Sequence, residues 1–263
     1  MTELKIALLP LDTAWADIEE NLFVTDQVLK TLPADTDVVV LPELFSTGFI
    51  AEQASVSRYA EPAEQSKTLN RLRDMSAHYN MALAGSFLAR NRDGRPVNRG
   101  FFIEPSGETT FYDKKHLFCI SPEAQTIEAG KHPVPVVRFR GWNIGLGICY
   151  DLRFPAWLRN TGEKYDLLLL PANWPTKRDK AWSTLLAARA IENIAYVAGV
   201  NRSGSDDYGE YDSTMSKVVD YVGDDISVHR EDGIVIAQLD KSRLNSFRSK
   251  FPFLNDADNF KFY

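Results

Sequence analysis

Cysteine 149 occupies the position in this sequence that best suits covalent chemistry. It follows the apolar residues 144–148, which predict a strand, and it precedes Pro155, whose fixed backbone suits the start of a helix. A strand-to-helix turn would lift the thiol onto the rim of a sheet, where helical amides favour the nucleophilic thiolate. A free cysteine is as often a buried structural residue, so this local pattern leaves both interpretations open.

A thiol nucleophile needs a general base, and the usual base is histidine. The only histidine downstream of Cys149 is His229, and its flanks predict a strand that runs into an exposed turn. Glu43 is a better candidate because it lies just past the β-branched residues 38–41, and open α/β sheets gather active residues at strand ends. Poor solvation there would raise the carboxyl pKa toward a value useful for proton transfer. Taken alone, Glu43 is also compatible with a turn or helix-cap role.

Lys114 could supply a positive charge to the same chemistry. It forms a charged pair with Lys115 between a predicted strand and the apolar residues Leu117 and Phe118, so one of the two lysines could point inward. Tetrahedral intermediates carry an oxyanion, which an ammonium group and a backbone N–H can stabilise. The alternative interpretation is a solvated surface pair.

Other chemistries lack their sequence signatures. The chain has no phosphate-binding loop, and the glycines at 145 and 147 are followed by Tyr150 where a dinucleotide fingerprint needs glycine. The four histidines are scattered without the spacing of metal ligands, so we expect neither a metal nor a cofactor. The formal net charge of -6 disfavours binding to nucleic acids and to anionic membranes.

Short strands and helices alternate along the chain, and they must position these residues. We expect strands at residues 4–9, 38–41, 81–87, 143–149, 166–170 (ended by Pro171), 194–200 and 234–237. We expect helices after a cap at Asp12 or Thr13, at residues 63–78 and 179–193, and after a cap at Asp240. Turns at residues 91–94, 105–108 and 140–143 add hairpins. This mixture predicts an α/β fold with two packed sheets and helices outside.

The composition fits a single soluble domain over residues 1–263. Hydrophobic residues make up 44% and charged residues 25%, and no linker, repeat or low-complexity segment divides the chain. The two cysteines form no framework of the secreted kind, and neither a signal peptide nor a membrane-spanning run is recognisable, so we expect a cytoplasmic location. The aromatic tail, about residues 250–263, should dock on this chain or on a partner.

Three separated segments together resemble the Glu-Lys-Cys signature of the nitrilase superfamily, the carbon–nitrogen hydrolases. These segments are residues 41–49, 112–118 and 147–155, which hold Glu43, Lys114 and Cys149 in the family's order and wide spacing. Further family segments are matched by residues 171–175 and 188–193. The sequences Tyr-Asp-Lys-Lys-His-Leu-Phe and Pro-Ala-Asn-Trp-Pro are similar to the omega-amidase branch.

The resemblance implies a role for each matched residue. Glu43 would be the general base, Lys114 the oxyanion stabiliser together with the backbone N–H of Tyr150, and Cys149 the nucleophile that forms a thioester. Glu123 matches a second family glutamate, which would hold Lys114 or the substrate amide. The family also implies a single-domain, four-layer α-β-β-α sandwich. It implies a homodimer or larger homo-oligomer too, and we expect the tail to dock on the partner subunit. Residues 210–213 depart from the Gly-Asp-Ser of the branch, which leaves the shape of that loop open.

The omega-amidase branch hydrolyses small dicarboxylate monoamides, so the resemblance implies a substrate such as 2-oxoglutaramate or 2-oxosuccinamate. Arg153 lies four residues after Cys149, where it could bind the substrate carboxylate or form a structural salt bridge. Phe118 and Trp174 could wall the pocket. The alternatives are an N-carbamoyl amino acid, an aliphatic amide or a nitrile as substrate, or a noncatalytic scaffold of the same fold.

Overall fold

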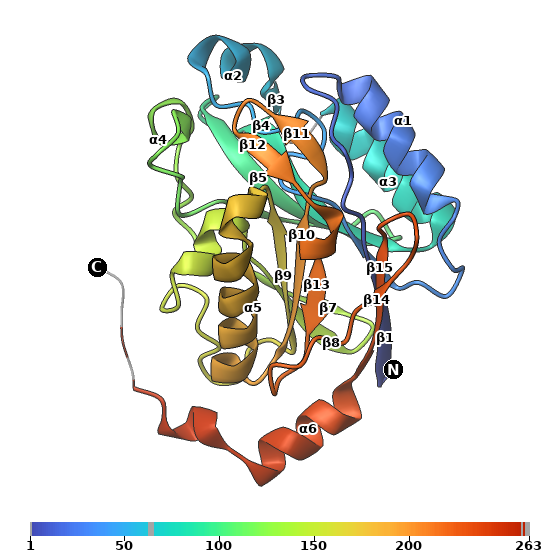
Figure 1. Ribbon diagram of the computed structural model, residues 1–263, viewed down its shortest axis with the longest axis vertical. Coiled ribbons are helices and arrows are strands. Elements are labelled where there is room, and N and C mark those ends of the chain that lie inside the picture. Colours follow the sequence, from blue (N-terminus) through green and yellow to red (C-terminus); the bar gives the residue numbers. More distant parts are fainter. Residues whose placement is uncertain (1, 63–65, 259, 261–263) are drawn as a thin grey trace.

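Two β-sheets pack face to face in the computed structural model of the protein, which describes residues 2–62, 66–258 and 260 (Figure 1). The larger sheet has the strand order β14-β15-β1-β2-β4-β5-β6, and the short strand β3 pairs with β4. Strands β1, β2 and β4 run parallel to one another. The strands are β1 (Glu3–Leu8), β2 (Val38–Val40), β3 (Glu61–Pro62), β4 (Ala82–Arg90), β5 (Pro96–Ile103), β6 (Thr109–Asp113), β14 (Val228–His229) and β15 (Val235–Asp240).

The smaller sheet has the strand order β13-β10-β9-β8-β7, in which β8, β9 and β10 are parallel. Its strands are β7 (Val136–Phe139), β8 (Trp142–Leu146), β9 (Leu167–Ala172), β10 (Tyr196–Asn201) and β13 (Lys217–Val219). A separate hairpin joins β11 (Gly204–Asp206) to β12 (Gly209–Tyr211). Parallel strands end at the same edge of a sheet, so side chains just past these ends can meet.

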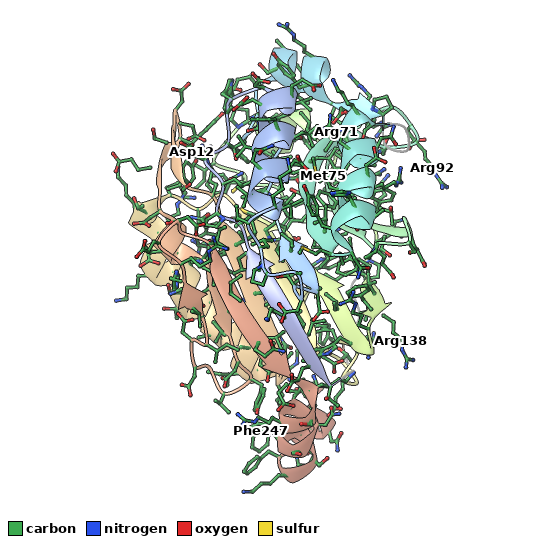
Figure 2. All side chains as sticks on the ribbon, turned by 90° about the vertical axis from the view of Figure 1, so that its right-hand side faces the viewer. Asp12, Arg71, Met75, Arg92, Arg138 and Phe247 are labelled. Carbon is green, nitrogen blue, oxygen red and sulfur yellow. The ribbon has the colours of Figure 1, made fainter. Side chains whose placement is uncertain are left out.

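Helices cover the outer faces of both sheets. Helices α1 and α3 contact each other over the larger sheet (Figure 2), and α5 covers the smaller one (Figure 1). The layers are therefore helix, sheet, sheet and helix, which confirms the expected α-β-β-α sandwich. The α-helices are α1 (Ile18–Leu29), α2 (Gln53–Tyr59), α3 (Lys67–Tyr79), α4 (Glu123–Thr126), α5 (Asp179–Asn193) and α6 (Lys241–Lys250). The 3₁₀ helices are η1 (Cys149–Arg153), η2 (Thr176–Arg178), η3 (Ser213–Met215) and η4 (Phe253–Asp256).

Strand alternation explains why both faces of the larger sheet are buried. In β1, Ile6 and Leu8 belong to the apolar cluster between the sheets, whereas Ala7 belongs to the cluster under α1 and α3. In β2, Val40 belongs to the cluster between the sheets, and Val39 belongs to the cluster under α1 and α3. Strands covered on both sides need apolar residues at every position, which accounts for the unbroken β-branched run.

Two helix starts differ from the sequence expectation. Helix α1 is capped by Asp17, whose side chain accepts the Glu20 N–H at 3.0 Å. The predicted cap Asp12 is instead held in a β-bridge to Ser203, so the helix begins later. Helix α3 begins at Lys67 after the cap Ser66, and the predicted start at Ala63 lies outside the described residues.

Strand β9 does not end at Pro171 as expected, but continues to Ala172. Pro171 pairs with Val200 of β10. On the other side, β8 ends at Leu146 opposite Leu169, so no neighbouring strand requires the N–H that proline lacks. The helix expected to begin near Pro155 also starts earlier, because Cys149 itself opens η1.

Helix α6 follows its predicted cap and lies at one end of the molecule, remote from α2 (Figure 1). The side chain of Asp240 accepts the Ser242 N–H at 2.8 Å. Beyond the helix, Phe251 packs on Phe247 with ring centroids 5.0 Å apart, and Phe253 is 60% exposed. Residues 259 and 261–263 of the predicted tail lie outside the described residues. Within the described ranges, no helix has the length and apolar character needed to cross a membrane.

Candidate active site

The ends of three strands bring Glu43, Lys114 and Cys149 together. Glu43 comes shortly after β2, Lys114 directly follows β6, and Cys149 comes shortly after β8. All three side chains are buried, and Nζ of Lys114 donates a 2.8 Å hydrogen bond to Oε1 of Glu43. The Glu43 carboxylate is close enough to the Cys149 thiol to raise the pKa of that thiol. The structure thus gathers the carboxylate, ammonium and thiol that the sequence pattern indicates.

The backbone beside these groups adopts a conformation that is rare for residues with side chains. Cys149 has a φ of +47°, and Leu44, which follows Glu43, has a φ of +48°. This left-handed region strains L-residues, and such strain is common at functional sites. The Leu44 N–H donates to Oγ of Ser86 at 2.9 Å, which holds the turn after Glu43. The turn at Cys149 leads directly from β8 into η1 and leaves the thiol on a cavity wall.

A network of buried hydrogen bonds fixes the lysine. Its ammonium donates to Oε1 and Oε2 of Glu123 at 2.9 and 3.0 Å, as well as to Glu43. Asn98 of β5 donates to Oε1 of Glu43 at 2.9 Å, and the Phe118 N–H donates to Oε2 of Glu123 at 2.6 Å. Oε2 of Glu43 has no hydrogen-bond partner among the described residues. This second oxygen is therefore available to take a proton.

The loop that follows Lys114 is closed at its base by Gly130. The Gly130 N–H donates to the Lys114 carbonyl oxygen at 2.8 Å. A Cβ atom at Gly130 would overlap the Asp113 carbonyl oxygen, so only glycine permits this approach. The loop between them carries Phe118 and Glu123, and its closure keeps both beside the lysine.

Burial and charge set the protonation of the two buried ionic groups. Burial raises the pKa of Glu43, Lys114 lowers it, and Glu123 raises it again, with the net shift upward. Burial opposes the charge on Lys114, but the carboxylates of Glu123 and Glu43 outweigh it and hold the lysine pKa well above its usual value. The ammonium therefore stays charged, while Glu43 is tuned toward proton exchange.

The expectation that helical amides would hold Cys149 as a thiolate is wrong. Burial and the adjacent Glu43 carboxylate raise the pKa of the thiol well above its usual value, and Lys114 only partly offsets them. The physical reason is that the sulfur faces a carboxylate in a desolvated site. The cysteine therefore rests as a thiol and needs Glu43 to remove its proton.

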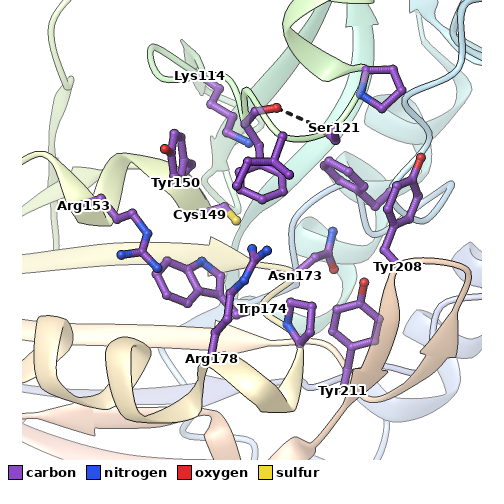
Figure 3. Close-up of a pocket in the computed structure, with 15 residues that line it drawn as sticks. Lys114, Ser121, Cys149, Tyr150, Arg153, Asn173, Trp174, Arg178, Tyr208 and Tyr211 are labelled. Carbon is purple, nitrogen blue, oxygen red and sulfur yellow. Dashed lines mark hydrogen bonds between the residues drawn. The ribbon is translucent and has the colours of Figure 1, made fainter.

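A cavity of about 200 Å³ opens over the Cys149 sulfur (Figure 3). The predicted residues Tyr150, Arg153, Phe118 and Trp174 all line it, together with Lys114. Glu123 does not line the cavity but supports the lysine from behind. The remaining lining residues are Phe49, Ile120, Ser121, Pro122, Asn173, Pro175, Arg178, Tyr208 and Tyr211. His229, the alternative base, lies in the exposed strand β14 on another part of the molecule.

Three site residues were not predicted individually. Asn98 lies near the start of β5, where nothing in the sequence distinguishes it. Asn173 follows β9 within the segment Pro-Ala-Asn-Trp-Pro, and its Nδ2 donates to the Glu43 carbonyl oxygen at 3.0 Å. Arg178 ends η2, and its guanidinium lies 4.7 Å from the centroid of the Phe118 ring. The position directly after strand β9 is the signal that could have indicated Asn173.

Asp151 links the lysine segment to the cysteine turn behind the cavity. Its Oδ2 accepts the Ile148 N–H at 3.1 Å and the Tyr112 hydroxyl at 2.8 Å. Its Oδ1 accepts the His116 N–H at 3.0 Å. Ile148 precedes Cys149, and the other two donors lie on either side of Lys114, so one buried carboxylate sets the relative position of both segments.

Comparison with known proteins identifies the family and the fold. The family model described as carbon–nitrogen hydrolase matches residues 5–249. The chain is 41% identical to the omega-amidase YafV of Yersinia enterocolitica, with 99% of each chain covered, and 30% identical to the 2-oxoglutaramate amidase of Bacillus subtilis, with 95% and 96% covered. The crystal structure of XC1258 from Xanthomonas campestris, a CN-hydrolase superfamily protein with an arsenic adduct in its active site, matches with a TM-score of 0.92, 33% identity and complete coverage of both chains. The chain therefore belongs to the carbon–nitrogen hydrolase family.

Proposed function

We propose that this protein is an omega-amidase. It hydrolyses the terminal amide of a small dicarboxylate monoamide, such as 2-oxoglutaramate or 2-oxosuccinamate, to the acid and ammonia. The observation that carries the proposal is the buried Glu43–Lys114–Cys149 cluster beneath a small cavity with cationic side chains in its walls. Relatives named omega-amidase and 2-oxoglutaramate amidase support the same substrate class.

Acylation begins at the Cys149 sulfur. The sulfur attacks the amide carbon while Oε2 of Glu43 takes the thiol proton, and the carbonyl becomes an oxyanion. Lys114 and the backbone N–H of Tyr150, at the start of η1, stabilise that oxyanion. Glu43 then gives its proton to the departing nitrogen, the C–N bond breaks, and ammonia and a Cys149 thioester remain.

Deacylation uses the same groups with water as the nucleophile. Glu43 takes a proton from water as its oxygen attacks the thioester carbonyl, and Lys114 again meets the oxyanion. The C–S bond breaks, the product acid forms, and Glu43 returns the proton to sulfur. One raised-pKa carboxyl group thus transfers a proton in each direction in both half-reactions, a contribution of about 10²–10⁴-fold.

Ammonia release tests the proposal. The wild-type protein should release ammonia from 2-oxoglutaramate faster than from an N-carbamoyl amino acid, an aliphatic amide or a nitrile. Mass spectrometry of the protein quenched during turnover should find an acyl adduct on Cys149. The proposed substrate class would be overturned if the protein released no ammonia from 2-oxoglutaramate or 2-oxosuccinamate but hydrolysed another compound in this panel.

The proposal also covers the oligomeric state of the protein and its location in the cell. We propose a cytoplasmic homodimer in which the tail after α6 docks on the partner subunit. The exposed Phe253 supports this docking because a large apolar side chain at a surface favours burial against another chain.

A further inference from the structure

Two arginines in the cavity wall lack the acidic partners that the buried arginines of this fold have. The buried guanidinium of Arg248 bonds to Asp166, and that of Arg202 bonds to Asp206, each at 2.9 Å. The guanidinium groups of Arg153 and Arg178, in contrast, have no ion pair or hydrogen bond within the described part of the chain, although both residues line the cavity. A structural salt bridge among the described residues therefore does not explain why either arginine is present in the cavity wall.

Both guanidinium groups rest on aromatic rings. The Arg153 guanidinium lies 4.7 Å from the Trp174 ring centroid, and the Arg178 guanidinium lies 4.7 Å from the Phe118 ring centroid. Stacking of this kind engages the face of the guanidinium and leaves the in-plane N–H donors free for a carboxylate. Figure 3 shows Arg153 beside Trp174.

The charge of the cavity is opposite to that of the molecule. The formal net charge of the chain is -6, but the charged lining residues are Lys114, Arg153 and Arg178, and none of the lining residues is acidic. Both arginines also act on the Tyr150 phenol. Burial and Cys119 raise the pKa of that phenol, and the two guanidinium groups oppose the rise. Their charges therefore reach the same part of the cavity.

We propose that Arg178 is a specificity-determining residue, which binds the substrate carboxylate together with Arg153 in the wall of the cavity. This inference rests on the proposed amidase function and adds the residue that selects an anionic substrate. Arg178 is the less exposed of the two arginines, so its ion pair is less screened by solvent. The pair selects monoamides of dicarboxylic acids over uncharged amides that lack the carboxylate.

Steady-state kinetics of Arg178→Gln provides the test. The substrates are 2-oxoglutaramate and the uncharged butanamide, and Lys177→Gln is the matched control because Lys177 is exposed, adjacent and outside the cavity lining. Loss of a charge-assisted hydrogen bond should raise KM for 2-oxoglutaramate at least about tenfold, with little change in kcat. The kinetics with butanamide should change less than about threefold, and Arg178→Lys should be intermediate.

A binding readout makes the inference independent of turnover. Iodoacetamide alkylation of Cys149, followed by mass spectrometry of its peptide, should be slowed by glutarate in the wild type. In Arg178→Gln, the same protection should need at least about tenfold more glutarate. Equal protection in both proteins, or equal changes in KM for the charged and uncharged substrates, would overturn the role of Arg178. If glutarate protects the wild type normally but 2-oxoglutaramate is not hydrolysed, the proposed function fails while the anion site stands.

Discussion

Asp151 holds His116 by two contacts to the same oxygen. Oδ1 of Asp151 accepts the His116 backbone N–H at 3.0 Å and lies 2.7 Å from Nδ1 of the His116 ring. The ring in turn stacks on Phe154 with centroids 3.7 Å apart. Because Asp151 also accepts the N–H that precedes Cys149, the lysine segment cannot shift without moving the cysteine turn.

Asp151→Asn should therefore impair catalysis more than substrate binding. An amide side chain cannot accept all of these hydrogen bonds, and a buried donor left without an acceptor costs about 1–3 kcal/mol. We expect a lower Tm, and a kcat reduced up to about 10²-fold with KM for 2-oxoglutaramate nearly unchanged. The exposed Asp93→Asn is the control. A KM that rises while kcat stays constant would contradict the positioning role.

Cys149→Ala should abolish ammonia release while preserving the fold. The substitution removes only a sulfur atom from the site, so we expect a circular dichroism spectrum and a Tm close to those of the wild type. Loss of a covalent nucleophile commonly lowers kcat by about 10⁴-fold or more. The exposed Cys119→Ala should retain activity, because this second cysteine is outside the buried cluster. Residual turnover by Cys149→Ala near the wild-type rate would exclude the thioester mechanism.

The acid limb of the pH profile should lie above the range of an ordinary glutamate. Burial raises the pKa of Glu43, and the general base must be deprotonated to act. Activity should therefore fall as the pH falls through this raised pKa, and it should be restored when the pH returns. The measurement is kcat/KM for 2-oxoglutaramate against pH, which reports the free enzyme. A limb at or below the usual pKa of a glutamate would show that another group is the base.

Glu123→Gln should move that acid limb to lower pH. The Glu123 carboxylate raises the pKa of Glu43, so its neutral isostere removes the repulsion and the pKa falls. The variant should also be slower, because Lys114 loses one of the two carboxylates that fix it. The comparison uses kcat/KM profiles of the two proteins at the same ionic strength. If the acid limb stayed at the same pH or moved to higher pH, the coupling between the carboxylates of Glu43 and Glu123 would be refuted.

Deletion of residues 251–263 should weaken self-association. The aromatic series from Tyr221 through Phe247 and Phe251 ends at the exposed Phe253, which suits burial by a second copy. Light scattering coupled to size exclusion should give a dimer for the full chain and a larger monomer fraction for the shortened one. An unaltered dimer after truncation would place the interface elsewhere.

The sequence predicted those parts of the site that local pattern and order along the chain determine. Glu43, Lys114 and Cys149 each follow a predicted strand, and the packing of the two sheets brings the ends of β2, β6 and β8 together. Asn98 and Arg178 could not be selected in this way, because their roles depend on which side chains face them across the two sheets.

Protonation was the least predictable property of the site. The sequence pattern predicts helical amides that favour a thiolate, but burial and the Glu43 carboxylate raise the pKa of the Cys149 thiol. Only the tertiary structure shows that these two groups share one desolvated space. The predicted cap of α1 at Asp12 failed for a similar reason, since the bridge between Asp12 and Ser203 connects distant parts of the chain.

The proton retained by Cys149 has a consequence for the lifetime of the enzyme. Peroxides and disulfides react with thiolates far more readily than with thiols. A sulfur that ionises only when a substrate arrives is therefore shielded from stray oxidants between turnovers. Burial, together with the same carboxylate that starts each cycle, thus also preserves the nucleophile in its reduced form.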